Sequence, residues 1–204
     1  MNKKVLIETQ LFTPNKISLT EGKLSDNGNP LVEGILATVE VKNGNGRYYP
    51  KELWQREINN YMSCVKENRA LGELDHPDST IINLKNVSHN IKKIFWDGDN
   101  IMGVIEILPT PSGNILKELI KNNITVGVSS RGMGSLQQVG EVLEVQDDFE
   151  LLAWDFVSTP SNPGSWMRPI KESLNESQIK NINKYQKINS IITEILCSHG
   201  SCPI

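Results

Sequence analysis

The chain has 204 residues, of which 38% are hydrophobic and 22% are charged, and its formal net charge is −3. This composition predicts one folded domain of ordinary size and excludes a disordered tract, and no apolar run approaches the roughly 20 residues that cross a bilayer. The basic residues are scattered and outnumbered, which argues against direct binding of nucleic acid.

Cysteine usage and the start of the chain indicate the cellular compartment. The three cysteines, Cys64, Cys197 and Cys202, are an odd number without metal-finger spacing. Residues 5–7 are the only apolar run before Glu8, which is too short for a signal-peptide core. We therefore expect a protein of a reducing interior.

The first part of the chain alternates between strand and loop patterns. Residues 5–12 predict a short strand, and residues 14–30, rich in Asn, Ser and Gly, predict a loop. Residues 35–41 alternate with a period of two, which predicts a second strand, and the Asn-Gly repeat at 43–46 ends it.

A helix is predicted from Pro50 onward, because a proline at an early helical position has no N–H hydrogen bond to lose. Its apolar stripe has helical spacing and leads the chain to a loop at 72–78; the stripe consists of Leu53, Trp54, Ile58, Tyr61, Met62 and Val65. Residues 87–96 and 101–108 are two apolar runs around an Asp-Gly turn, which predicts a hairpin.

The remaining elements complete a strand-rich α+β pattern. Ser112 is a candidate N-cap for a helix over 112–122. Strands are predicted at 124–128, 138–145 and 149–158, and a weakly amphipathic helix at 178–196. After Pro169 the composition is polar, so residues 1–170 are expected to form the domain and residues 171–204 a tail.

His76 stands in a loop between Asp75 and Asp78, and Pro77 keeps it out of helical geometry. A histidine among carboxylates suits a general base, because its imidazolium is stabilised there. The alternative interpretation is a surface histidine in an acidic turn, without a catalytic role. His89 alternates with apolar neighbours and is predicted to be a strand residue.

A serine pair enters the glycine-rich segment 127–134, which is predicted to turn after the strand. Alternation places Ser130 on the apolar face with Val128 and directs Ser129 outward, so Ser129 is the better candidate nucleophile. Arg131 or a nearby backbone N–H, such as that of Gly132, would stabilise an oxyanion. The alternative interpretation is a junction between a strand and a turn, in which Ser and Gly serve the turn and have no catalytic role.

Asp155 lies in an otherwise apolar strand, where an unpaired carboxylate is costly to bury. A histidine N–H, a backbone amide or Arg168 would each satisfy it. With His76 and Ser129 it completes the residue types of an acyl-transfer site. His89 and His199 lack ligand spacing to His76, so no metal or other cofactor is predicted.

Several motifs in the same order along the chain resemble the prohead core proteases of tailed bacteriophages, of the T-even type. They are Leu-Ile-Glu-Thr from residue 6, Asn-Gly-Arg-Tyr-Tyr-Pro-Lys from 45, Gly-Glu-Leu-Asp-His-Pro from 72, Gly-Val-Ser-Ser-Arg-Gly-Met-Gly-Ser from 127 and Asp-Phe-Val-Ser-Thr-Pro-Ser-Asn-Pro from 155. The family is distantly similar to herpesvirus assemblins. The resemblance therefore implies a closed β-barrel surrounded by helices.

The resemblance implies a serine endopeptidase that acts inside the prohead, in the host bacterial cytoplasm. Its partners would be scaffold, core and capsid proteins, with a homodimer as the oligomer suggested by assemblins. His76 would be the base, Ser129 the nucleophile and Asp155 the third member.

Family cuts follow the Glu of apolar-x-Glu sites. In the polar tail, three such sites end at Glu172, Glu176 and Glu194, so the tail is expected to be removed by self-cleavage; the sites ending at Glu8 and Glu33 match the same short pattern. Two rival hypotheses are a catalytically silent core or scaffold protein and a metal-dependent hydrolase that uses Asp75, His76 and Asp78.

Overall fold

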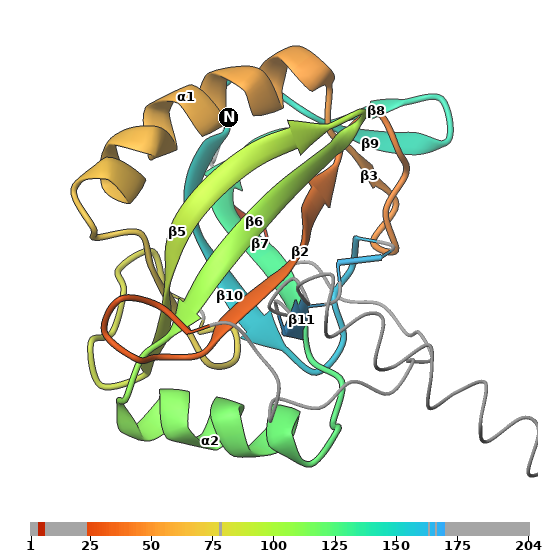
Figure 1. Ribbon diagram of the computed structural model, residues 1–204. Helices are drawn as coiled ribbons and strands as arrows, with labels where there is room; N and C mark the ends of the chain where they lie inside the picture. The colour runs from red at the N-terminus through yellow and green to blue at the C-terminus, as the bar shows by residue number, and fades with distance from the viewer. Residues whose placement is uncertain (1–3, 7–23, 78, 163, 166, 170–204) are drawn as a thin grey trace, which may run out of the picture. The chain divides into compact units, whose positions relative to one another are not determined.

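Strands make up most of the secondary structure in the computed structural model, which describes residues 4–6, 24–77, 79–162, 164–165 and 167–169. Figure 1 shows the two helices at opposite ends of the strand layers. The elements in chain order are β1 (Lys4–Leu6), β2 (Leu31–Thr38), β3 (Arg47–Tyr48), α1 (Lys51–Lys66), β4 (Leu71–Glu73), β5 (Val87–Asp97), β6 (Asn100–Ile107), α2 (Pro111–Lys121), β7 (Gly127–Gly134), β8 (Leu136–Val139), β9 (Val142–Val145), β10 (Glu150–Val157) and β11 (Met167–Pro169).

The strands form three sheets, ordered β1-β7-β10, β11-β2-β6-β5-β4 and β3-β9-β8. The strand-rich α+β class expected from the sequence is therefore confirmed, but no closed barrel is found in the described part of the chain. Among the described residues no continuous ladder joins the first two sheets, although backbone contacts link them. Leu74, just after β4, forms an isolated parallel bridge with Phe156 of β10, and the N–H of Met167 donates to the carbonyl of Val126 at 3.3 Å.

The chain leaves the sheet directly after the Leu74 bridge, which explains why the pairing between β4 and β10 does not continue. Asp75 has a φ of 70°, in the left-handed region, where a short polar side chain is tolerated. Pro77 follows His76 and has no N–H to give to a ladder. The candidate histidine therefore lies where β4 turns away from β10.

Helix α1 begins at Lys51, one residue after the predicted start, because Pro50 is its N-cap rather than its first helical residue. Its buried face packs by aromatic contact: Trp54 stacks on Trp154 of β10 at 6.0 Å, and Tyr61 meets the same ring edge-on at 5.1 Å. Phe149 joins Trp54 at 5.9 Å. These rings fix the core face of β10 and thereby direct the next residue, Asp155, to the other face.

Helix α2 begins one residue earlier than predicted, and its cap is Thr110 rather than Ser112. The hydroxyl of Thr110 accepts the N–H of Gly113 at 3.0 Å. Pro111 occupies the first helical position, where its missing N–H has no intrahelical partner to lose. Ser112 lies inside the first turn.

The turn predicted in the glycine-rich segment is wrong, because β7 runs straight through it between β1 and β10. Gly132 and Gly134 instead allow the strand to pack closely against Phe149. A Cβ at Gly132 would lie 2.4 Å from the Phe149 ring, and one at Gly134 would lie 3.1 Å from the Cα of Phe149. Only glycine lets the strand lie this close to Phe149.

Several other boundaries agree in part with the prediction. The hairpin is confirmed as β5 and β6, and the strand at 149–158 as β10. The strand predicted at 35–41 starts earlier, at Leu31. The loop predicted at 72–78 begins as a strand, β4.

A single strand was predicted at 138–145, but the structure has the hairpin β8–β9 there. Gly140, with a φ of 58°, permits the turn between the two strands. The predicted strand at 5–12 overlaps β1, and its part beyond Leu6 lies outside the described residues, as does the predicted helix at 178–196.

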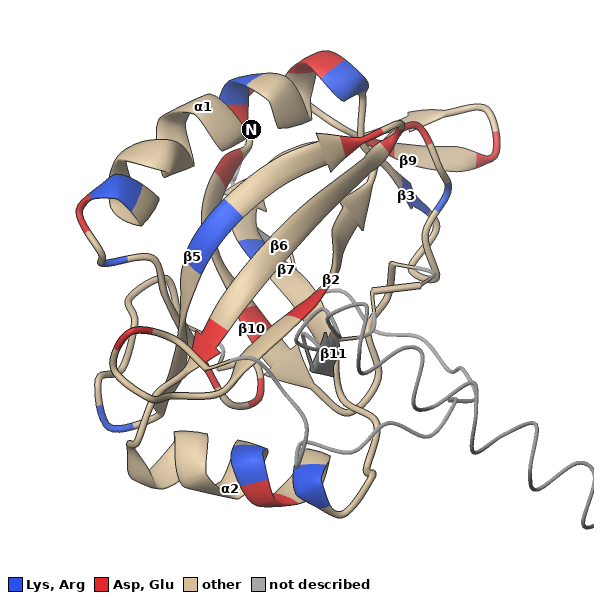
Figure 2. Cartoon of the chain, viewed as in Figure 1, with Lys and Arg blue, Asp and Glu red and all other residues tan. Residues whose placement is uncertain are grey.

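Charged residues of both signs are interspersed over α1, α2 and the strand ends (Figure 2). None of the described helices is long and apolar enough to span a bilayer.

Candidate functional site

Two neighbouring strands carry the candidate nucleophile and the candidate carboxylate. Ser129 of β7 is the direct cross-strand partner of Asp155 of β10, and such pairs have Cβ atoms about 5 Å apart on the same face. Alternation adds Arg131 to that face. Ser130 pairs with Trp154 on the opposite face.

The two serines therefore have different surroundings. Ser130 lines a small pocket with Tyr49 and Trp54, on the core side of the sheet. Ser129 faces away from this aromatic core, as the alternation predicts, yet it is only 1% exposed. The face with Arg131 is covered by the segment that joins β4 to β5, because the Arg131 guanidinium donates to the carbonyl of Ser79.

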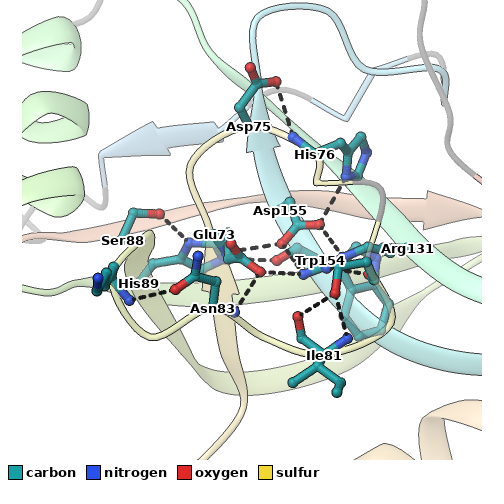
Figure 3. A network of polar contacts seen from close by, with 12 residues as sticks. Glu73, Asp75, His76, Ile81, Asn83, Ser88, His89, Arg131, Trp154 and Asp155 are labelled. Carbon is teal, nitrogen blue, oxygen red and sulfur yellow. Dashed lines mark hydrogen bonds and ion pairs between the residues drawn. The ribbon is translucent and has the colours of Figure 1, made fainter.

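Backbone contacts bring His76 to Asp155. The bridge between Leu74 and Phe156 is followed by a hydrogen bond from the N–H of Asp75 to the carbonyl of Phe156 at 2.8 Å. The Asp75 carboxylate then accepts the N–H of His76 at 3.0 Å. His76 is thus positioned over the residue that precedes Phe156, which is Asp155 (Figure 3).

The imidazole of His76 contacts Asp155 directly: its Nδ1 lies 2.9 Å from Oδ2, and the His76 side chain is 6% exposed. An ionised carboxylate only accepts hydrogen bonds, so Nδ1 carries the proton. In the neutral ring Nε2 is then unprotonated, and this buried atom has no hydrogen-bond partner. A free Nε2 lone pair is what a general base needs.

Asp155 is fully buried and accepts from three groups. Besides His76, the N–H of Glu73 donates to Oδ1 at 2.9 Å, and Arg131 places Nε 2.8 Å from Oδ2 and Nη2 3.1 Å from Oδ1. Burial acts to raise the pKa of Asp155, but the hydrogen bond from His76 and the Arg131 charge outweigh it and hold the pKa below its usual value. The partner considered as an alternative, the Arg168 side chain, lies outside the described part.

Arg131 was expected at the substrate or oxyanion, but its side chain lies in the interior of the protein. It is fully buried, and besides Asp155 it binds Glu73 Oε1 at 3.0 Å and the Ser79 carbonyl at 2.7 Å. A role in substrate or oxyanion binding does not fit a guanidinium that is already occupied by buried partners. Gly132, the other residue expected there, lies in the middle strand of its sheet and packs against Phe149.

His89 lies in β5, as predicted, and is also fully buried beside this site. Its Nε2 contacts the Trp154 carbonyl at 3.0 Å and its Nδ1 the Ser88 hydroxyl at 2.9 Å. A carbonyl only accepts, so Nε2 carries the proton and Nδ1 accepts from Ser88. Burial lowers the pKa of His89 to about 4. Gly72 leaves room for this contact, because a Cβ there would lie 2.3 Å from the ring.

This neutral histidine predicts a loss of stability in mild acid. Unfolding returns the pKa of His89 from about 4 to 6.5, so the unfolded chain takes up a proton at intermediate pH. The His89 contribution is complete above pH 6.5 and is lost as the pH falls to about 4, by about 3 kcal/mol in total. Urea unfolding at several pH values should show this slope in the wild type and a smaller one in His89→Gln, which does not titrate. Equal slopes would contradict the assignment.

Among the described residues, no group of three or more His, Cys, Asp or Glu side chains could hold a metal ion. The metal-hydrolase hypothesis used Asp75, His76 and Asp78, and Asp78 lies outside those residues. His76 itself is hydrogen-bonded to Asp155 through Nδ1.

Sequence reasoning missed Glu73. It is fully buried, binds Arg131, and accepts the N–H of Asn83 at 3.0 Å. The signal was present, because Glu73 stands among Leu71, Gly72 and Leu74, just as Asp155 stands in an apolar strand. The argument that a carboxylate in an apolar run needs a partner applies to both residues.

Comparison with known proteins identifies a matching family, a similar protein and a similar solved structure. A family model described as "Prohead core protein serine protease" matches residues 4–178. The prohead core protein protease of Enterobacteria phage T4 is 33% identical over 152 residues, which cover 72% of this chain and 71% of that protein. The solved structure of the bacteriophage T4 capsid assembly protease, gp21, is similar with a TM-score of 0.68 and 28% identity, over 77% of this chain and 99% of that one.

Proposed function

The chain belongs to the family of prohead core protein serine proteases, and on this basis we propose that it is a serine endopeptidase of phage capsid maturation. The observation that carries the proposal is the 2.9 Å contact between His76 Nδ1 and Asp155 Oδ2, on the strand that pairs Asp155 with Ser129. This contact supports a base whose tautomer is fixed, and the carboxylate that fixes it is the cross-strand partner of Ser129. That combination is the arrangement used for acyl transfer.

In this mechanism the Ser129 hydroxyl attacks the scissile carbonyl while Nε2 of His76 takes its proton. The new C–O bond gives a tetrahedral intermediate, whose collapse expels the amine after His76 returns the proton. Water then hydrolyses the acyl-enzyme by the same route. Asp155 stabilises the imidazolium without taking the proton, and its lowered pKa keeps it ionised at neutral pH.

The substrates proposed are core and shell proteins of the prohead, cut inside the particle after the Glu of apolar-x-Glu sites. The polar tail carries three such sites, ending at Glu172, Glu176 and Glu194. Under the proposal, residues 1–170 form the protease domain, and self-cleavage after these glutamates trims the tail, residues 171–204.

A peptide assay tests this function. Full-length protein incubated with a peptide that contains Ile-x-Glu should cut after Glu, and excess EDTA should leave the rate unchanged, because the proposed chemistry uses no metal. Mass spectrometry of the products locates the cut. Cleavage that the chelator abolishes would support the metal-hydrolase hypothesis, and a protein that cuts neither the peptide nor prohead core proteins would support the silent scaffold.

A further inference from the structure

Glu73 belongs to the buried charge cluster under His76, although no step of the proposed mechanism uses it. One nitrogen of Arg131, Nη2, contacts both Glu73 Oε1 at 3.0 Å and Asp155 Oδ1 at 3.1 Å. Glu73, Arg131 and Asp155 are all fully buried. Figure 3 shows their side chains converging below the His76 ring.

The charges of this cluster do not cancel. Arg131 forms ion pairs with both Glu73 and Asp155, and with both carboxylates ionised the three groups have one net negative charge next to His76. If Asp155 and Arg131 were alone, they would form a neutral pair, and much of the carboxylate's field at His76 would be offset by the guanidinium. Because charges interact strongly where water is excluded, the glutamate behind Arg131 restores that field.

Glu73 also ties the chain together on both sides of His76. Its backbone N–H donates to Asp155, and its side chain accepts the N–H of Asn83, which lies beyond His76 in the segment between β4 and β5. Arg131 holds the same segment through the Ser79 carbonyl. The cluster therefore anchors the segment from which His76 projects.

We propose that Glu73 is a positioning residue of this site: it offsets the charge of Arg131 so that the cluster under His76 keeps a net negative charge for the imidazolium formed during acyl transfer. Other titratable described residues lie close to this cluster: Asp75, whose carboxylate accepts the His76 N–H, neutral His89, and Tyr61, whose pKa is raised by burial and which interacts with Asp155 and Arg131. The inference rests on the proposed serine mechanism, but its electrostatic part can be measured without catalysis.

The variant Glu73→Gln isolates the charge, because glutamine has the same shape and its amide oxygen can accept from Arg131 and Asn83. In a Ser129→Ala background, which prevents self-cleavage, the NMR titration midpoint of the His76 ring should fall by roughly one pH unit. In the Ser129 enzyme, kcat should fall roughly tenfold with KM little changed, and the acidic limb of the kcat/KM profile should move to lower pH.

Two further variants separate this role from a structural one. Glu73→Asp keeps the charge but shortens the side chain, so it should keep the wild-type midpoint. Glu106→Gln removes another buried glutamate, which contacts Ser25, Asn29 and Lys92, and it should leave the His76 midpoint and kcat unchanged. An unchanged midpoint in a folded Glu73→Gln protein would overturn the proposal.

If Glu73→Gln does not fold, the double variant Glu73→Gln with Arg131→Met removes both charges and leaves Asp155 as the one net negative charge. Its midpoint should stay within about 0.3 pH units of the wild type, since the net charge is kept. Its kcat should fall, because the anchor of the His76 segment is lost. A midpoint shift of a full unit, or an unchanged kcat, would contradict the inference. If the protein proves inactive but the titration midpoint of His76 still falls in Glu73→Gln, the proposed serine mechanism is refuted while the electrostatic role of Glu73 stands.

Discussion

Replacing Ser129 with alanine should lower kcat for peptide cleavage by a factor on the order of 10⁴ to 10⁶, because the acyl-enzyme can no longer form. The fold should be retained, because alanine removes a single oxygen and fits the same strand conformation. The rate is measured by mass spectrometry of a peptide containing Ile-x-Glu, and unfolding in urea checks stability. The loss should appear in kcat with little change in KM.

Ser130→Ala is the matched control, because it removes the same atom from the next residue of the same strand. Ser130 lies on the core face beside Tyr49 and Trp54, so this variant should keep kcat within a few-fold of the wild type. If Ser130→Ala abolished cleavage while Ser129→Ala did not, Ser130 rather than Ser129 would be the nucleophile, and the assignment of the catalytic face of β7 would be wrong.

Replacing Arg131 with methionine should lower the free energy of unfolding by about 3–5 kcal/mol, because two buried carboxylates lose their shared cation. Glu73 and Asp155 are both fully buried, so water cannot replace the guanidinium. Equilibrium unfolding in urea measures the loss. Arg131→Lys keeps the charge but not the paired geometry, and it should lose less stability than the methionine variant.

The effect of Arg131→Met should depend on pH in a defined direction. The pKa of Asp155 is lowered in the folded protein, so the stability it contributes is present above its unfolded value near 4 and is lost as the pH falls through the folded value. The variant lacks the part of this contribution that comes from Arg131, so the difference between its free energy of unfolding and that of the wild type should become smaller below about pH 4. A loss under 1 kcal/mol at neutral pH would show that the cluster tolerates the unpaired carboxylates.

Alternating side-chain patterns predicted much of the site. The order of Val128, Ser129 and Ser130 along one strand was enough to assign the two serines to opposite faces, because side-chain direction in a strand is set locally. An isolated carboxylate in an apolar strand was enough to predict a partner for Asp155. The identity of that partner depended on Leu74 pairing with Phe156, which are far apart in the sequence.

The errors have a common physical origin. Gly132 and Gly134 were interpreted as a turn, but their local sequence does not reveal that Phe149 packs against them. Arg131 was expected to reach the substrate, because nothing near it in the sequence shows Glu73 coming from β4. In each case a contact between distant segments decides what the residue does, and such contacts are set by tertiary packing rather than by local pattern.

The central claim is that Ser129, set opposite Asp155 and activated through His76, is the nucleophile. Its most direct test is covalent labelling of the intact chain with a fluorophosphonate, in which the serine oxygen bonds to phosphorus and fluoride leaves. The account predicts one adduct, located on Ser129 by peptide mass spectrometry, formed with loss of cleavage and absent in His76→Ala. An adduct on Ser130, or an enzyme that cleaves fully and never reacts, would contradict it.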